Sequence, residues 1–262
     1  MTSIISANWK MNGSKELIDS WFELFFVNTV DFEKQNDLSE KDIPIVVLCV
    51  PAVFLDYVVK KAESYNSKTK YFKVLVGAEN CHNMLKGAFT GDTSVIFVKE
   101  IGCDYAIVGH SERRQYYAES DELVSKKAVT VVENKLIPIV CVGESLQIRE
   151  SNKHFEFVGE QIINSTVDLD MQDIVIAYEP LWAIGTGKVP SENDIDEMSG
   201  YIKEILSKTK NVDKKDVRVL YGGSVKSDNS HAIIHLDSVD GVLVGGASLK
   251  GDEFFKIVVS SL

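Results

Sequence analysis

The chain has 262 residues, which suits one α/β barrel or two ordinary domains. Hydrophobic residues make up 45% and charged residues 26% of the sequence, the composition of an ordinary soluble protein. A formal net charge of −11 argues against nucleic acid as a partner, because neutralising phosphates needs clustered Lys and Arg.

The N-terminal sequence MTSIISANWKMN contains no apolar stretch of signal-peptide length, and no apolar run approaches the roughly 18 residues of a membrane span. We therefore expect no membrane as a partner. The four cysteines have no metal-binding or redox spacing, and Cys49 and Cys141 lie inside apolar runs. We interpret them as reduced core residues, which predicts a cytoplasmic location.

Eight short apolar runs, rich in Val and Ile, recur along the chain, and their length and branching favour strands buried on both faces. In chain order they are SIISAN, PIVVLCV, KVLVGAE, DYAIVGH, IPIVCVG, DIVIAYE, VRVLYGG and VDGVLVGG. Helical patterns lie between them, over Lys15–Val30, Phe54–Tyr65, Ser94–Gly102, Asp121–Asn134, His154–Val167, Ser191–Ser207, Ser227–His235 and Ala247–Ser260. Ser191 is expected to cap the sixth helix. Two connections, Asp31–Asp42 and Ser64–Lys73, are expected to be surface loops.

Strict alternation of strands and helices predicts a parallel sheet, and eight such units in about 250 residues fit a closed (β/α)₈ barrel. The alternative is an open, doubly wound sheet. That fold usually carries a glycine-rich nucleotide-binding sequence after its first strand, where this chain reads NWKMNG. No linker or low-complexity tract divides the chain, so we predict a single α/β domain over residues 1–262.

Polar residues follow several of the predicted strands at the ends where barrel chemistry gathers. Asn8 and Lys10 follow the first strand, His110 the fourth and Glu179 the sixth, while glycine pairs follow the seventh and eighth. Each feature alone is ordinary, since a lysine after a strand is usually solvated and glycine pairs usually serve turns. Together they would place a base, an electrophile, a cation and a phosphate-binding turn at one mouth.

Two further motifs are not expected to bind ligands. The sequence GTGK resembles part of a nucleotide-binding loop, but Trp182 replaces its first Gly and Val189 its Ser or Thr. His231 and His235 lie one helical turn apart, but Ala232 stands where a metalloprotease has its Glu. We therefore predict no metal site and no cofactor.

The motifs NWK, GHSERR, AYEPLWAIGTGK, YGGS and LVGGAS together resemble the triosephosphate isomerase family, and the resemblance runs from Ala7 to about Leu249. It implies a TIM barrel that interconverts dihydroxyacetone phosphate and D-glyceraldehyde 3-phosphate through an enediol, in glycolysis and gluconeogenesis. It also implies a homodimer in the cytoplasm, without cofactor or metal.

The resemblance assigns a role to each motif residue. Glu179 would be the base, His110 a neutral hydrogen-bond donor to the substrate oxygens, Lys10 the positive charge, and Asn8 an orienting group. Ser111 and Glu112 would support His110. The phosphate would meet backbone N–H groups at four positions, namely Gly185, Ser224, Gly245 and Gly246.

The stretch AYEPLWAIGTGKVP places large apolar residues directly after Glu179 in a glycine-rich segment. Burying such side chains is worth roughly 1.5–3 kcal/mol each, so we expect them to find cover. By resemblance, residues 180–190 form a lid that excludes water from a reactive enediolate.

Three positions depart from the family's usual pattern. The loop Asn80–Thr93 would dock on a second subunit, with Thr90 near the partner's Asn8, yet Glu79 stands where Gln is usual. Asp92 replaces a usual Glu that pairs with the residue here numbered Arg113. Pro190 stands where a backbone N–H normally receives the hydroxyl of the residue here numbered Tyr221.

Two alternatives remain open from the sequence. One is a barrel that binds a sugar phosphate without isomerase chemistry, which intact Lys10, His110 and Glu179 argue against. The other is a Schiff-base aldolase, which needs a lysine within a strand, and no lysine lies in the apolar runs after the third.

Overall fold

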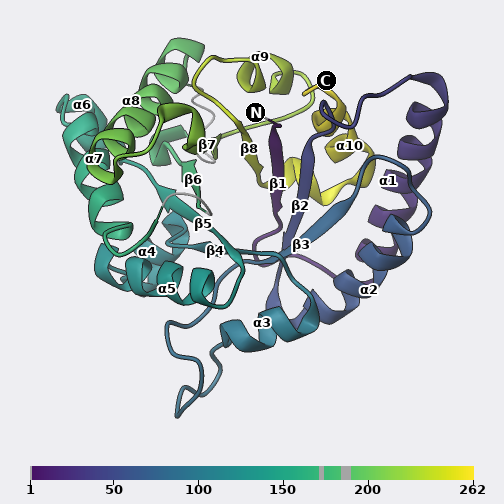
Figure 1. Cartoon of the computed structure of the whole chain (residues 1–262), viewed down its shortest axis with the longest axis horizontal. Coiled ribbons are helices and arrows are strands. Elements are labelled where there is room, and N and C mark those ends of the chain that lie inside the picture. The colour runs from purple at the N-terminus through teal and green to yellow at the C-terminus, as the bar shows by residue number, and fades with distance from the viewer. Residues whose placement is uncertain (1, 171–173, 184–189) are drawn as a thin grey trace.

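A computed structural model describes residues 2–170, 174–183 and 190–262 of the chain. Eight parallel strands close into a barrel, and helices surround it (Figure 1). Strand β1 pairs with β2 on one side and with β8 on the other, so the sheet has no open edge. This closure confirms the (β/α)₈ barrel and excludes the open, doubly wound sheet.

The strands coincide with the predicted apolar runs, shortened by a few residues. They are β1 (Ile4–Asn8), β2 (Ile45–Val50), β3 (Val74–Ala78), β4 (Tyr105–Val108), β5 (Ile137–Val142), β6 (Val175–Tyr178), β7 (Arg218–Tyr221) and β8 (Gly241–Val244).

The helices of the described residues are α1 (Lys15–Gln35), α2 (Leu55–Asn66), α3 (Val95–Ile101), α4 (Ser111–Tyr117), α5 (Asp121–Glu133), α6 (Leu146–Glu150), α7 (His154–Ser165), α8 (Glu192–Lys210), α9 (Ser230–Ile234) and α10 (Gly251–Val259). Short 3₁₀ turns lie at Ala52–Phe54, Leu181–Ala183, Lys214–Asp216 and Gly246–Leu249.

Four expectations about the helices need correction. Helix α1 continues to Gln35, because Phe32 packs against the core, so only the later part of Asp31–Asp42 is a loop. Helix α2 likewise continues to Asn66, so it includes the first residues of the expected loop Ser64–Lys73. The helix expected over Ala247–Ser260 is divided, because Lys250 is extended between a 3₁₀ turn and α10. The short helices α4 and α6 were not predicted.

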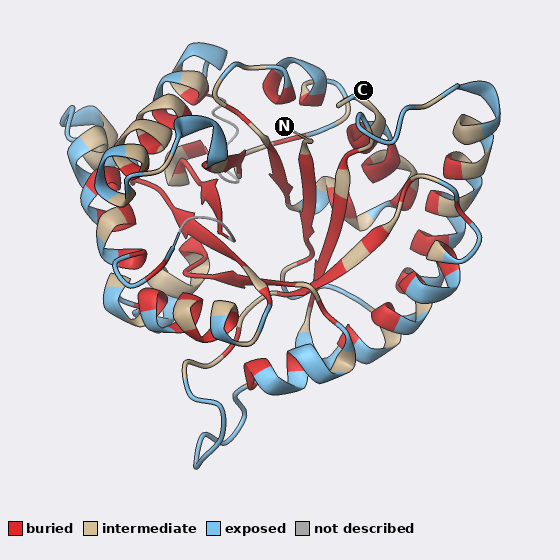
Figure 2. Cartoon of the chain, in the orientation of Figure 1, coloured by how far each residue is buried: buried red, intermediate tan, exposed pale blue. Residues whose placement is uncertain are grey.

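The barrel has two apolar layers, because successive side chains of a strand point to opposite faces. Ile4, Val47, Ile107 and Leu220 belong to the cluster that fills the interior. The other cluster lies between the strands and the helices, and Figure 2 shows that the helices bury the faces turned toward the strands. A filled interior leaves the ends of the strands as the place for a site.

The expected cap of α8 is confirmed. The Ser191 hydroxyl accepts a hydrogen bond from the Asp194 backbone N–H, and the Asp194 carboxylate accepts one from the Ser191 backbone N–H. This reciprocal pair satisfies two donors that a helix start leaves open. It also fixes the start of α8 immediately after Pro190.

Two features bear on the sequence-based expectations. Cys49 and Cys141 are buried and free, as their apolar surroundings predicted. Among the described residues, no helix is both long and apolar enough to span a membrane.

The connection between β3 and α3 projects away from the barrel (Figure 1). Most of it is exposed (Figure 2). It contains the predicted docking loop, and its apolar side chains Met84 and Phe89 are 49% and 40% exposed.

Candidate active site

The predicted site residues meet at the carboxyl ends of the strands. Asn8 ends β1, His110 follows β4 and Glu179 follows β6, and all three line one cavity of about 570 Å³ together with Lys10. The sequence predicted that the barrel brings these strand ends together, but it did not predict the size or the lining of the cavity.

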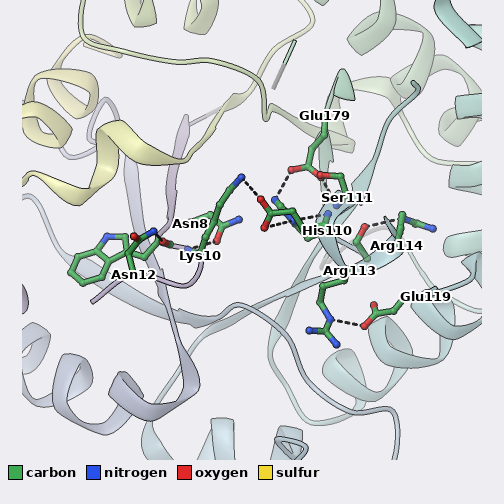
Figure 3. Close-up of polar contacts among 12 residues, drawn as sticks. Asn8, Lys10, Asn12, His110, Ser111, Arg113, Arg114, Glu119 and Glu179 are labelled. Carbon is green, nitrogen blue, oxygen red and sulfur yellow. Dashed lines mark hydrogen bonds and ion pairs between the residues drawn. The ribbon is translucent and has the colours of Figure 1, made fainter. Parts of the chain in front are cut away.

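The carboxylate of Glu179 points toward His110 and Ser111 (Figure 3). Its Oε2 accepts a 2.9 Å hydrogen bond from the Ser111 backbone N–H, and its Oε1 lies 2.9 Å from Nε2 of His110. Burial alone would raise the pKa of Glu179, but His110, the Ser111 N–H and the charge of Lys10 outweigh burial and lower it. The carboxylate is therefore ionised at neutral pH, as a base must be.

Two glycines make room for Glu179, and sequence reasoning missed both roles. A Cβ on Gly143 would lie 1.8 Å from the Glu179 carbonyl oxygen, and one on Gly222 would lie 2.9 Å from Glu179 Cγ. Any side chain at either position would displace the base.

His110 is held from two sides. Its Nδ1 accepts the backbone N–H of Glu112 at the start of α4, so that nitrogen carries no proton, and its Nε2 faces Glu179. Burial favours the neutral ring, but the carboxylates of Glu179 and Glu112 outweigh burial and raise the pKa of His110. The hydrogen bond at Nδ1 nevertheless fits the expected neutral ring, in which Nε2 carries the proton. A substrate oxygen beside Nε2 would separate His110 from Glu179, whose charge raises the pKa of His110.

Lys10 supplies the cation at the site. Its Nζ lies 2.7 Å from Oε1 of Glu112, and its backbone N–H is donated to the side chain of Asn8. The backbone of Lys10 is left-handed, with φ of 56°, an uncommon conformation for a non-glycine residue. Figure 3 shows the Lys10 side chain directed toward the side of the site where His110 and Glu179 lie.

Three of the four expected phosphate-binding residues lie in the wall of the same cavity as Glu179. Ser224, Gly245 and Gly246 line the cavity, and Cε of Lys10 would be 3.8 Å from a Cβ on Gly245. Lys226 and Lys250 also line it, although sequence analysis did not single them out. Gly185, the fourth expected contact, lies outside the described residues, as do residues 184–189 of the expected lid.

The two ends of that lid are described. The large apolar residues Leu181 and Trp182 are each partly buried, and Ala183 is fully buried. Trp182 donates its indole N–H to Oε1 of the buried Glu144. Leu181 and Trp182 thus have cover, as the sequence suggested, while Ile184 lies outside the described residues.

Arg113 has a different partner from the one expected. It donates to Glu119 at 2.5 Å, and Glu119 also binds Lys127 (Figure 3 shows the first contact). Asp92 lies 3.9 Å from the His82 ring instead. Within one chain the Asp92–Arg113 pair is absent from the described contacts, although both residues line the same surface cavity.

Glu79 also lines that surface cavity, which measures about 660 Å³. Its Oε1 is buried and has no hydrogen-bond partner among the described residues. Burial raises the pKa of Glu79 to about 8, with a further contribution from Glu112 and opposition from Lys10. The raised pKa expected for Glu79 from burial against a second subunit is thus already present within one chain.

Comparisons with known proteins agree with the geometry. The family described as "Triosephosphate isomerase" matches residues 3–261 of the chain. A protein of that name from Alkaliphilus metalliredigens is 44% identical over 262 residues, covering 97% of this chain and 98% of the relative. Another, from Lactobacillus delbrueckii subsp. lactis, is 43% identical and covers 98% of this chain and 97% of the relative.

Proposed function

The chain belongs to the triosephosphate isomerase family, and from that premise we propose how its own residues perform the reaction. The enzyme interconverts dihydroxyacetone phosphate and D-glyceraldehyde 3-phosphate, a step of glycolysis and gluconeogenesis. The observation that carries the proposal is the convergence of Glu179, His110, Lys10 and Asn8 on one cavity. We also propose that residues 1–262 form a single domain.

Glu179 acts as the base. It removes the proton from the carbon next to the substrate carbonyl, and the electron pair of that C–H bond forms the double bond of the enediol. The same carboxyl group then returns a proton to the neighbouring carbon, and a hydroxyl proton passes from one substrate oxygen to the other. The reaction therefore moves two protons, changes no overall oxidation state and needs no cofactor. The burial of Glu179 in the cavity wall and its ionised state support this role, because only the ionised carboxylate can accept a proton.

His110 stabilises the charge that develops on the oxygens. Its Nε2 faces the cavity, while Nδ1 is occupied by the Glu112 backbone N–H. A substrate oxygen would take the position beside Nε2 that Glu179 now occupies. Donors fixed in advance at such an oxygen are worth more than donors that must reorganise.

Lys10 and the glycine turns bind the anionic substrate. The protein carries a net charge of −11, so the phosphate needs a local positive field. Lys10, Lys226 and Lys250 line the cavity beside Gly245 and Gly246 and supply it. Asn8 would orient the oxygens at the reacting carbons.

We further propose a homodimer through the loop 80–93. The exposed apolar side chains Met84 and Phe89 of this loop support it, as does Met11, which is 98% exposed beside the cavity that Glu79 lines. Covering such residues is favourable by roughly 25 cal/mol per Å² of apolar surface. Sedimentation at several protein concentrations would measure the dimer.

The test of the site is Glu179→Gln, which keeps the shape of the base and removes its basicity. Turnover in a coupled assay should fall by orders of magnitude, since a positioned base contributes roughly 10²–10⁴-fold. Glu160→Gln, on the exposed face of α7, is the matched control and should leave turnover unchanged. Retained turnover in Glu179→Gln would refute the assignment.

A further inference from the structure

Arg149 in α6 contacts both chain ends between which residues 184–189 lie. Its guanidinium lies over the ring of Trp182, with Cζ 5.5 Å from the ring centroid, a distance at which cations and aromatic faces attract. Its Nη2 forms an ion pair with Asp194. Trp182 belongs to the turn before residues 184–189, and Asp194 belongs to the first turn of α8 after them.

The same guanidinium faces a buried acid. Glu144 is fully buried, and its Oε1 accepts hydrogen bonds from the Tyr178 hydroxyl and the Trp182 indole at 3.1 and 2.8 Å. Nη1 of Arg149 lies 3.9 Å from that oxygen. Burial raises the pKa of Glu144, while the donors and Arg149 oppose the rise. Arg149 thus lies beside a carboxylate that accepts a hydrogen bond from Trp182.

The turn that Trp182 occupies is coupled to the reacting groups. The Leu181 backbone N–H is donated to the Glu144 carbonyl, and the Ser224 hydroxyl is donated to the Ala183 carbonyl at 3.3 Å. Ser224 lines the substrate cavity, and Glu179 precedes Leu181 by two residues. A shift of this turn therefore moves groups on two sides of the cavity.

We propose that Arg149 is a positioning residue of the isomerase, which holds Trp182 and Asp194 at once and so fixes the turn Leu181–Ala183 relative to the start of α8. This inference rests on the proposed roles of Glu179 and Ser224. Arg149 itself does not line the cavity. Its effect on the reaction passes through the turn Leu181–Ala183 and the start of α8.

The geometry requires arginine specifically. A guanidinium is planar and presents five donors, so it can stack on a ring and bind a carboxylate in the same orientation. A lysine ammonium is a point charge that can approach Asp194 but cannot also lie flat on Trp182. Arg149→Lys therefore keeps the positive charge but loses the simultaneous contact with Trp182 and Asp194.

The experiment compares Arg149→Met, Arg149→Lys and Lys203→Met by kcat, KM, affinity for phosphoglycolate and thermal midpoint. Phosphoglycolate carries a phosphate and a planar carboxylate that mimics the enediolate. Lys203→Met is the matched control, because Lys203 of α8 forms another ion pair, with Asp240. Each of these two side chains is 12% exposed. Lys203→Met should lower the midpoint and leave kcat and phosphoglycolate affinity unchanged.

For Arg149→Met we expect kcat and phosphoglycolate affinity each to fall about tenfold, which equals about 1.4 kcal/mol, while KM stays nearly constant. Arg149→Lys should recover the thermal midpoint but neither kcat nor phosphoglycolate affinity. Full recovery of kcat by lysine would overturn the inference, because charge alone would suffice. An equal loss of kcat in Arg149→Met and Lys203→Met would also overturn it, as a general effect of destabilisation.

Glu179→Gln, measured in parallel, separates this inference from the proposed site. If Glu179→Gln retains turnover, the proposed site is wrong. If Glu179→Gln is inactive and Arg149→Met matches the parent, only the role of Arg149 is refuted.

Discussion

Replacing Glu79 by Gln should make the protein more stable at neutral pH and should strengthen its dimer. The pKa of Glu79 is raised by burial to about 8 from an ordinary value of 4.5. The folded chain therefore keeps this proton at pH values where the unfolded chain has released it. The stability that this group contributes is fully present below about pH 4.5 and is lost as pH rises to about 8.

The magnitude follows from those two values. Between these two pKa values, one group that is protonated only in the folded chain lowers the free energy of unfolding by about 1.4 kcal/mol for each unit of rising pH. The free energy of unfolding of the parent should therefore fall by about 2.5 kcal/mol between pH 5 and pH 7 through Glu79 alone. Gln has nearly the same shape and no proton to lose, so Glu79→Gln should show none of this loss. A second subunit on the cavity that Glu79 lines would desolvate the carboxyl further and increase the difference.

The assay is urea unfolding of both proteins at pH 5, 6, 7 and 8, each at several protein concentrations. The concentration dependence separates dimer dissociation from unfolding of the chain. Glu100→Gln, an exposed position on α3, controls for the loss of one charge and should follow the parent. Equal midpoints for Glu79→Gln and the parent at every pH would refute the reasoning.

Three other substitutions test the site. His110→Ala should lower turnover by roughly 10²–10⁴-fold with little change in thermal midpoint, and an unfolded variant would instead favour a structural role. Gly222→Ala should lower kcat by roughly 10²-fold, because its Cβ would lie 2.9 Å from Glu179 Cγ; circular dichroism would check that the fold is intact, and an unchanged kcat would contradict the crowding argument. Lys10→Met should raise KM for the phosphorylated substrate far more than it affects the thermal midpoint, since Lys10 is partly exposed and pairs with Glu112; an unchanged KM would exclude Lys10 from substrate binding.

The barrel could be predicted because each strand can be recognised from its own residues, without knowledge of its neighbours. Strands buried on both faces read as continuous apolar runs, and the predicted runs contain every strand of the structure. The ends of helices were less predictable. Helix α1 runs past Val30 because Phe32 packs against residues distant in the sequence, which local periodicity does not reveal.

The site was predictable to the extent that its residues follow strands. Glu179, His110 and Lys10 could be placed at one mouth from the alternation alone. The close packing of Gly143 and Gly222 against Glu179 could not, because a glycine in a sequence does not indicate which backbone approaches it. The contact of Arg113 with Glu119 likewise could not be predicted, because it depends on how the chain turns between α4 and α5.

The sequence and the structure together lead to a prediction about Tyr221 and Pro190. The sequence indicated that Pro190 offers no N–H to the Tyr221 hydroxyl. In the structure that hydroxyl is buried, lies against Gly223, and has no hydrogen-bond partner among the described residues. A buried hydroxyl without a partner costs free energy, so removing it should not destabilise the protein.

We therefore predict that Tyr221→Phe is nearly silent in the parent for both thermal midpoint and phosphoglycolate affinity. Pro190→Ala restores an N–H at the position where the family normally uses one, so in that background Tyr221→Phe should cost roughly 0.5–1.5 kcal/mol of phosphoglycolate affinity. The double-mutant cycle isolates this coupling because it subtracts the effect of each change alone. A full hydrogen-bond loss on Tyr221→Phe in the parent would mean that Tyr221 gains another partner when the ligand binds. In that case Pro190 would not be the reason that the Tyr221 hydroxyl has no hydrogen-bond partner among the described residues.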